Sequence, residues 1–299
     1  MLETTVIGSM PVWVDSSKYA GDYLEKIYSS PYPRLIDEAV KTQVTAGIDI
    51  VSDGQTRSDF VKLYVDGFRG VIMKDRPYVI EEIRYNGPIT VSDQEYVKKN
   101  LPPGVKLKGI LTGPYTLASN CVDEAYGGLR ELSNAFAEGL RLEAKALSQV
   151  VDYIQVDEPM MSIDYPDYAQ ELVETVFKDV KIPRLFHACG DVSKVFPHFT
   201  GFPVDVLEHE FAANPGLFDA VAEVDFEQKI GYGCVRSDQK EVETVSWIKQ
   251  HVGKAVDEFG IENVLLNPDC GLRNLPQESA KAKLENMVAA RDKILSDSD

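Results

Sequence analysis

Three short segments of the chain carry the side chains that most often hold a transition metal. His187 and Cys189 lie two residues apart, Glu208 and Glu210 flank a histidine, and Cys270 follows an Asn-Pro-Asp run. Residues two apart on a strand point to the same face, so the first pair can present an imidazole and a thiolate together. One imidazole, one carboxylate and two thiolates suit Zn²⁺ better than Mg²⁺ or Ca²⁺. These residues predict a zinc site in which either glutamate could supply the oxygen ligand.

Such a site needs a scaffold that brings distant segments together. Short β-branched or apolar runs alternate along the chain with amphipathic stretches. The eight runs span residues 4–8, 48–52, 107–111, 153–156, 184–187, 204–208, 229–232 and 264–267. The clearest helical stretches span residues 35–46, 129–150, 168–177, 217–222, 242–259 and 277–294.

This alternation predicts an α/β fold, a TIM (β/α)8 barrel, in which catalytic residues follow the carboxyl ends of the strands. The metal-binding segments come at the ends of the fifth, sixth and eighth runs, as that architecture requires. An open doubly wound sheet is the competing fold, but no Gly-x-Gly-x-x-Gly follows the first run.

The connection between the second and third runs departs from the pattern. From about residue 67 to 104, proline, glycine and β-forming residues at 78–80 and 89–91 replace a plain helix. This composition predicts a hairpin-bearing insertion after strand two, too short to form a domain. We therefore expect a single catalytic barrel domain over residues 1–299.

The composition argues against several classes of protein. Hydrophobic residues make up 44% of the 299, and no stretch is apolar over the roughly 20 residues of a membrane span. The formal charge of −17 repels phosphate backbones, so we expect neither a nucleic acid partner nor a membrane. Four widely spaced cysteines and the lack of a leader pattern favour a cytoplasmic protein.

Six motifs occur in order over nearly the whole chain. They read Thr-Val-Ile-Gly-Ser from Thr5, Thr-Gly-Pro from Thr112, Gln-Val-Asp-Glu-Pro from Gln155, His-Ala-Cys from His187, Asp-Val-Leu-Glu-His-Glu from Asp205 and Asn-Pro-Asp-Cys-Gly-Leu from Asn267. Their order and spacing resemble the catalytic zinc barrel of the cobalamin-independent methionine synthase family, in its short stand-alone "core" form. The resemblance implies a methyltransferase that methylates the thiol of L-homocysteine to form methionine.

The resemblance also implies roles for individual residues. The family binds Zn²⁺ through residues that correspond to His187, Cys189, Glu210 and Cys270. Glu210 is favoured over Glu208 because it stands five residues after the aspartate that starts the strand motif. The family's homocysteine site corresponds to Ile7, Gly8, Ser9 and Asp157, and Gln55 stands where the family carries a glutamate that helps bind the ammonium group.

Two further departures bear on the methyl donor. Asn120 stands where the family has a tryptophan that stacks on folate, and Arg236 where it has a proton-donating histidine. A folate nitrogen needs a proton to leave, whereas a cobalt leaving group does not. The resemblance therefore suggests a methylated corrinoid protein as the donor, with methyltetrahydrofolate as the alternative.

Other interpretations stay open at this point. A zinc methyltransferase of the same superfamily that acts on another thiol, such as coenzyme M, would use a similar donor set. A non-catalytic zinc-binding protein would do so too. Asp157 could instead cap the helix that follows its strand. We interpret Cys121 and Cys234 as packing residues.

Overall fold

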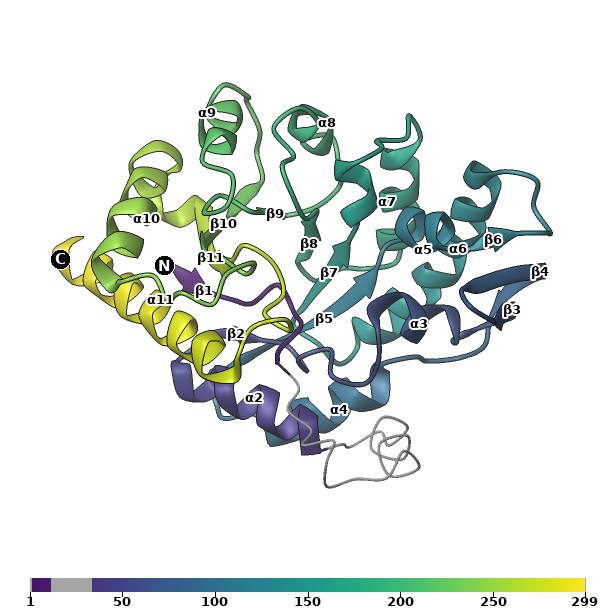
Figure 1. Cartoon of the computed structure of the whole chain (residues 1–299), viewed down its shortest axis with the longest axis horizontal. Helices are drawn as coiled ribbons and strands as arrows, with labels where there is room; N and C mark the ends of the chain where they lie inside the picture. Colours follow the sequence, from purple (N-terminus) through teal and green to yellow (C-terminus); the bar gives the residue numbers. More distant parts are fainter. Residues whose placement is uncertain (1, 12–33, 299) are drawn as a thin grey trace.

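The computed structural model describes residues 2–11 and 34–298, and its centre is a barrel of parallel strands (Figure 1). The strands are β1 (Glu3–Thr4), β2 (Ile50–Val51), β5 (Lys106–Thr112), β7 (Tyr153–Asp157), β8 (Arg184–His187), β9 (Val206–His209), β10 (Lys229–Val235) and β11 (Val264–Pro268). Their order is β1-β11-β10-β9-β8-β7-β5-β2, and a parallel bridge between Thr5 and Ile50 brings the two edges together. The TIM barrel prediction is confirmed, and each predicted run overlaps one strand.

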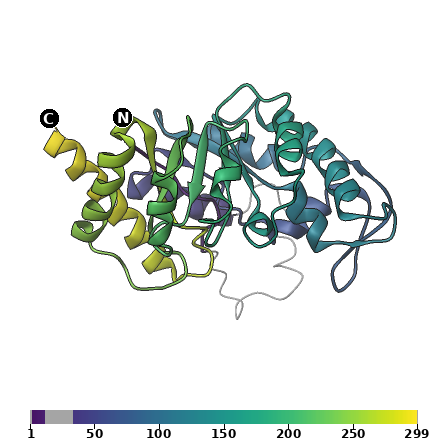
Figure 2. The same ribbon diagram turned by 90° about the horizontal axis from the view of Figure 1, so that it is seen from above.

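Helices surround the strands, as Figures 1 and 2 show. Those predicted are α2 (Arg34–Ala46), α6 (Leu129–Leu147), α7 (Ala169–Phe177), α9 (Gly216–Ala222), α10 (Val245–Phe259) and α11 (Gln277–Ser298). Shorter helical segments are α3 (Phe60–Val65), α5 (Pro114–Asn120), η2 (Pro159–Ser162), α8 (Phe196–Phe199) and η3 (Ile261–Asn263). In α6, Leu132, Phe136 and Leu140 are buried at a spacing of four residues, which is the stripe that packs on the barrel. Within residues 2–11 and 34–298, no helix has both the length and the hydrophobicity of a membrane span.

The insertion after β2 contains the predicted hairpin. Its antiparallel strands are β3 (Phe68–Met73) and β4 (Pro77–Tyr85), at the end of the molecule opposite α11 in both views (Figures 1 and 2). A short strand from beyond β5, β6 (Val122–Asp123), pairs with β4 in parallel and was not predicted.

The β-forming residues at 89–91 are not extended, which corrects the sequence interpretation. Helix α4 (Val91–Asn100) begins there, and Thr90 is its N-cap residue. The buried carboxylate of Glu143 accepts hydrogen bonds from the backbone N–H groups of Ile89 and Thr90, both at 2.9 Å. This tertiary contact fixes the turn and overrides the local strand preference.

Two layers of side chains of opposite character fill the barrel. Ile50, Leu185, Val206 and Leu265 form a buried apolar cluster near the amino ends of the strands. The residues two positions further along the same strands are all buried and polar: Ser52, His187, Glu208 and Asn267. Because alternate residues of a strand face the same side, both sets point into the barrel. The polar layer, which includes the predicted ligand His187, therefore stands directly above an apolar base.

Candidate metal centre

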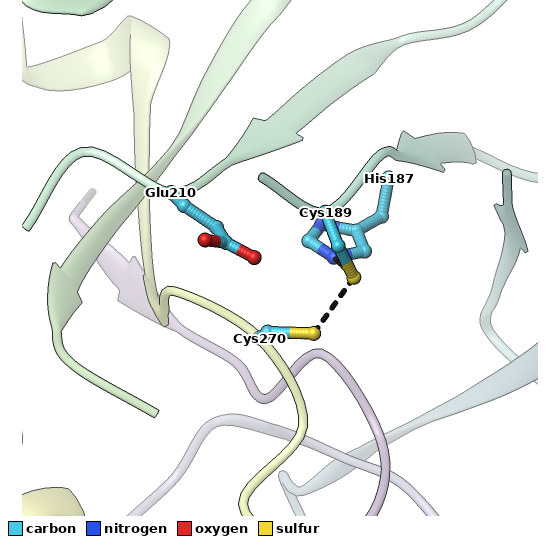
Figure 3. Close-up of side chains that lie close together, drawn as sticks. All are labelled: His187, Cys189, Glu210 and Cys270. Carbon is cyan, nitrogen blue, oxygen red and sulfur yellow. Dashed lines mark hydrogen bonds between the residues drawn. The ribbon is translucent and has the colours of Figure 1, made fainter. Parts of the chain in front are cut away.

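The four predicted metal ligands lie together at the carboxyl end of the barrel. His187 ends β8 and Cys189 follows it, Glu210 comes directly after β9, and Cys270 lies just beyond β11. One potential ligand atom from each residue lies within 4.8 Å of those of the other three. Figure 3 shows the four side chains pointing toward one another. Residues separated by up to 83 positions are thus assembled by three strand ends.

A hydrogen bond to the backbone orients the histidine. The Nδ1 atom of His187 lies 3.0 Å from the carbonyl oxygen of Glu208, and Nε2 lies 3.1 Å from Sγ of Cys189. Because the carbonyl can only accept, Nδ1 carries the proton, and Nε2 is left to face the other three side chains. A metal-binding histidine is commonly fixed in this way.

The two cysteine sulfurs are 2.8 Å apart (Figure 3). The hydrogen bond that Cys189 donates holds the pKa of Cys270 well below its usual range, and His187 lowers it further. The pKa of Cys189 is raised because its proton is shared with Cys270 and because it is buried. Burial raises the pKa of the Glu210 carboxyl group. This cluster brings two thiols and a carboxyl group together in a partly buried place, and such donors suit a divalent cation.

Glu208, the other candidate glutamate, lies on β9 and has a different role. Both carboxylate oxygens of Glu208 face Nζ of Lys108, at 3.1 and 3.4 Å, and both side chains are fully buried inside the barrel. A Cβ atom on Gly231 would lie 2.3 Å from Cγ of Glu208, so the glycine leaves the space that the Glu208 side chain occupies. The cluster therefore includes Glu210 and excludes Glu208. Lys108 was missed in the sequence, although a lysine within the apolar run 107–111 is a signal that could have identified it.

The predicted substrate residues lie beside this cluster. Gln155 donates from Nε2 to the carbonyl oxygen of Ile7, at 2.8 Å, and to Oδ1 of Asp157, at 2.5 Å. Asp157 pairs in register with His187, one of the predicted ligands, across β7 and β8. Burial raises the pKa of Asp157 to about 7, although the His187 charge and Gln155 lower it. Glu158, not Asp157, occupies the N-cap position of η2, so the capping interpretation of Asp157 is wrong.

The remaining three predicted substrate residues are also close. A Cβ on Gly8 would lie 2.8 Å from Oε1 of Gln55, and a Cβ on Gly271 would lie 2.0 Å from Oγ of Ser9. Gln55 has a φ of 48°, a left-handed conformation that turns the chain after β2 toward Gly8. The loops after β1, β2 and β7 thus reach the same end of the barrel as Cys270.

Comparison with known proteins identifies the family. Residues 2–293 match the catalytic domain of the cobalamin-independent synthase family. The chain belongs to the cobalamin-independent methionine synthase family. Methionine synthases from Methanocaldococcus jannaschii and Methanothermobacter marburgensis are 36% and 34% identical to it, over 96% of this chain and 97% and 98% of theirs. A B12-independent methionine synthase from Shewanella, solved with selenomethionine, has the same fold, with a TM-score of 0.84 at 22% identity over 99% of this chain and 98% of that one. The protein is a methyltransferase of this family.

One motif of this methionine synthase family member has a structural role that sequence reasoning missed. The Glu158 carboxylate accepts hydrogen bonds from the backbone N–H groups of Tyr115 and Thr116, at 2.9 and 2.8 Å, and from the Thr116 hydroxyl. A Cβ on Gly113 would lie 2.2 Å from the Glu158 side chain. The Thr-Gly-Pro and Asp-Glu-Pro segments are therefore in contact. The buried glutamate accepts hydrogen bonds from the first backbone N–H groups of α5, which have no acceptor within the helix.

The positions that depart from the family pattern interact within the chain. Asn120 donates from Nδ2 to the carbonyl oxygen of Thr116, one turn earlier in α5. Arg236 pairs with Asp238 at 2.8 and 2.6 Å. Cys234 is fully buried and Cys121 is partly buried, and neither belongs to the metal cluster.

Proposed function

We propose that this methyltransferase transfers a methyl group to the sulfur of L-homocysteine, forming methionine, with Zn²⁺ held by His187, Cys189, Glu210 and Cys270. The observation that supports it most is the assembly of these four side chains in a member of the methionine synthase family. Their potential ligand atoms all lie within 4.8 Å of one another. Two thiolates, an imidazole and a carboxylate match the ligands that zinc takes in proteins.

The chemistry depends on the state of the substrate thiol. A free thiol has a pKa of about 8.5 and is a weak nucleophile at neutral pH, whereas a thiol bound to Zn²⁺ is deprotonated. The residues of the chain keep that sulfur reactive. Two cysteine thiolates and the Glu210 carboxylate outweigh a divalent cation by one negative charge, so electron density is retained on the substrate sulfur.

The amino-acid end of homocysteine is assigned to the loops beside the cluster. Asp157 would accept the ammonium group, and Ile7, Gly8 and Ser9 would bind the carboxylate through backbone N–H groups and the Ser9 hydroxyl. Gln55 would accept a further hydrogen bond from the ammonium group without contributing charge. Gln155 holds Asp157 and the Ile7 backbone in place through its two hydrogen bonds.

Asp157 provides the test of the substrate. Asp157→Asn should raise KM for homocysteine about 10- to 100-fold. This is the loss of affinity expected when one hydrogen bond to a charged group is removed. Asp167→Asn, at an aspartate whose side chain is 88% exposed, is the matched control and should change nothing. Turnover of mercaptoethanesulfonate in preference to homocysteine would instead identify a coenzyme M methyltransferase.

We infer that the methyl donor is a methylated corrinoid protein rather than methyltetrahydrofolate. Asn120 offers no aromatic surface to a pterin, and a guanidinium such as that of Arg236 is a poor proton donor. The test supplies zinc and homocysteine with either methylcobalamin or methyltetrahydrofolate and measures methionine. Methionine from the folate alone would contradict this donor and leave the acceptor unaffected.

A further inference from the structure

The two ligands Glu210 and Cys270 follow strands that are not neighbours. Strand β10 lies between β9 and β11 in the sheet. No ladder of backbone hydrogen bonds therefore runs directly from β9, which precedes Glu210, to β11, which precedes Cys270. Both segments are hydrogen-bonded to β10, and a direct link between them would fix the separation of these two side chains more closely.

The carboxylate of Asp269 makes the missing connection. Asp269 immediately precedes Cys270 and is fully buried. Its Oδ1 accepts a hydrogen bond from the backbone N–H of Ala212 at 2.9 Å, and its Oδ2 accepts one from Ala213 at 2.7 Å. These two amides come just after Glu210, so one side chain ties the segment after β9 to the segment after β11.

A glycine in β10, the strand between β9 and β11, leaves room for the Asp269 carboxylate to pass over that strand. A Cβ on Gly233 of β10 would lie 2.4 Å from Oδ1 of Asp269 and 2.5 Å from the backbone oxygen of His209. Any other residue at this position would therefore displace the Asp269 side chain or the strand beside it. The backbone N–H of Asp269 also donates to Val235 of β10, at 2.8 Å, which anchors the residue from its other side.

We propose that Asp269 is a positioning residue of the metal centre, which sets the separation of Glu210 and Cys270 by binding the Ala212 and Ala213 amides across Gly233. This inference rests on the zinc site of the proposed function. Asp269 is not one of the four clustered donors. It acts through the backbone on which two ligands stand, and loss of such supporting contacts typically lowers metal affinity 10- to 100-fold.

Asp269→Asn tests the proposal with the smallest change of shape. An asparagine side chain has one acceptor oxygen and an NH₂ group, so in the same position it would place a donor against one of the two amide N–H groups. We expect zinc affinity, measured by competition with a chelator, to fall about 10- to 100-fold. We also expect the absorption bands of the Co²⁺-substituted protein to shift, because the Glu210 and Cys270 donors are displaced.

Glu143→Gln is the matched control. Glu143 is likewise a buried carboxylate that accepts from two consecutive backbone amides, but those amides, of Ile89 and Thr90, lie at the insertion. Both variants should lower the free energy of unfolding, and only Asp269→Asn should weaken zinc binding. Folded Asp269→Asn protein with the zinc affinity and Co²⁺ spectrum of the unaltered chain would overturn the proposal.

Hydrogen exchange in the unaltered protein tests the contact even if the variant does not fold. After zinc is removed by chelation, the Ala213 amide should remain protected, because Asp269 and not the metal holds it; the Ala212 amide also donates to the Gly233 carbonyl oxygen, at 3.0 Å, and does not distinguish the two. Exchange of the Ala213 amide at the rate of an unbonded amide would overturn the role of Asp269. Absence of stoichiometric zinc in the unaltered protein would instead contradict the proposed function.

Discussion

The two layers inside the barrel use the same strands for opposite purposes. The lower layer of Ile50, Leu185, Val206 and Leu265 is apolar and closely packed. Two residues further along, the same strands carry Ser52, His187, Glu208 and Asn267, all without exposure beyond 1%. Burial of apolar side chains stabilises the fold, whereas burial of polar ones costs free energy unless each is bonded. The comparison indicates that the lower layer holds the barrel closed so that the upper layer can position reactive groups.

Cys270→Ser should disrupt the metal cluster, to which the upper layer contributes His187, while leaving the lower layer intact. Loss of one thiolate should abolish stoichiometric zinc binding and lower turnover roughly 1000-fold, equivalent to about 4 kcal/mol of transition-state stabilisation. Metal analysis and methionine formation measure the two effects. Cys121→Ser, at a partly buried cysteine outside the cluster, should retain both zinc and turnover. Full activity of the Cys270 variant would remove the basis for a zinc mechanism.

Lys108→Met should produce the largest loss of stability. The substitution leaves Glu208 buried without its partner, and breaking a buried ion pair in this way typically costs about 3–5 kcal/mol. Denaturant unfolding measures it. Lys106→Met is the control on the same strand, because Lys106 is 42% exposed and pairs with Glu3 near the surface. That variant should lose at most about 1 kcal/mol. Equal losses in the two variants would show that the Lys108 pair is not effectively buried.

Ile50→Ala tests the lower layer by itself. Ile50 is fully buried, and β2 carries none of the four metal ligands. Truncation of a buried isoleucine typically lowers the free energy of unfolding by about 2–5 kcal/mol. Zinc stoichiometry should stay at that of the unaltered protein. A loss of zinc from this variant below its unfolding transition would mean that the two layers are not separable.

The sequence was sufficient for the barrel because alternating runs are local patterns, whereas the choice of Glu210 over Glu208 in the metal cluster depended on the resemblance to the family. Alternating runs predict strands, and the short motifs at their ends predict which side chains meet. Contacts between side chains from different strands could not be predicted from local sequence patterns. The Lys108–Glu208 pair, the Asp269 contact and the binding of α5 by Glu158 each join segments from different strands. The turn at Ile89 and Thr90 was misread for the same reason, since the Glu143 carboxylate that fixes it lies more than fifty residues away.

A pair of glycine substitutions gives the smallest effects and tests whether the polar layer needs a space provided for it. A Cβ on Gly231 would lie 2.3 Å from Cγ and 2.8 Å from Cα of Glu208, and overpacking of this kind typically costs about 1–3 kcal/mol. Gly253, within α10, has nothing within 4 Å of its Cβ position. Gly253→Ala should therefore stabilise the protein by about 0.5–1 kcal/mol through the better helix propensity of alanine.

Thermal unfolding of the two variants should thus shift in opposite directions. If Gly231→Ala were as stable as Gly253→Ala, Glu208 could move without cost, and the upper layer would not be the fixed arrangement on which the orientation of His187 depends.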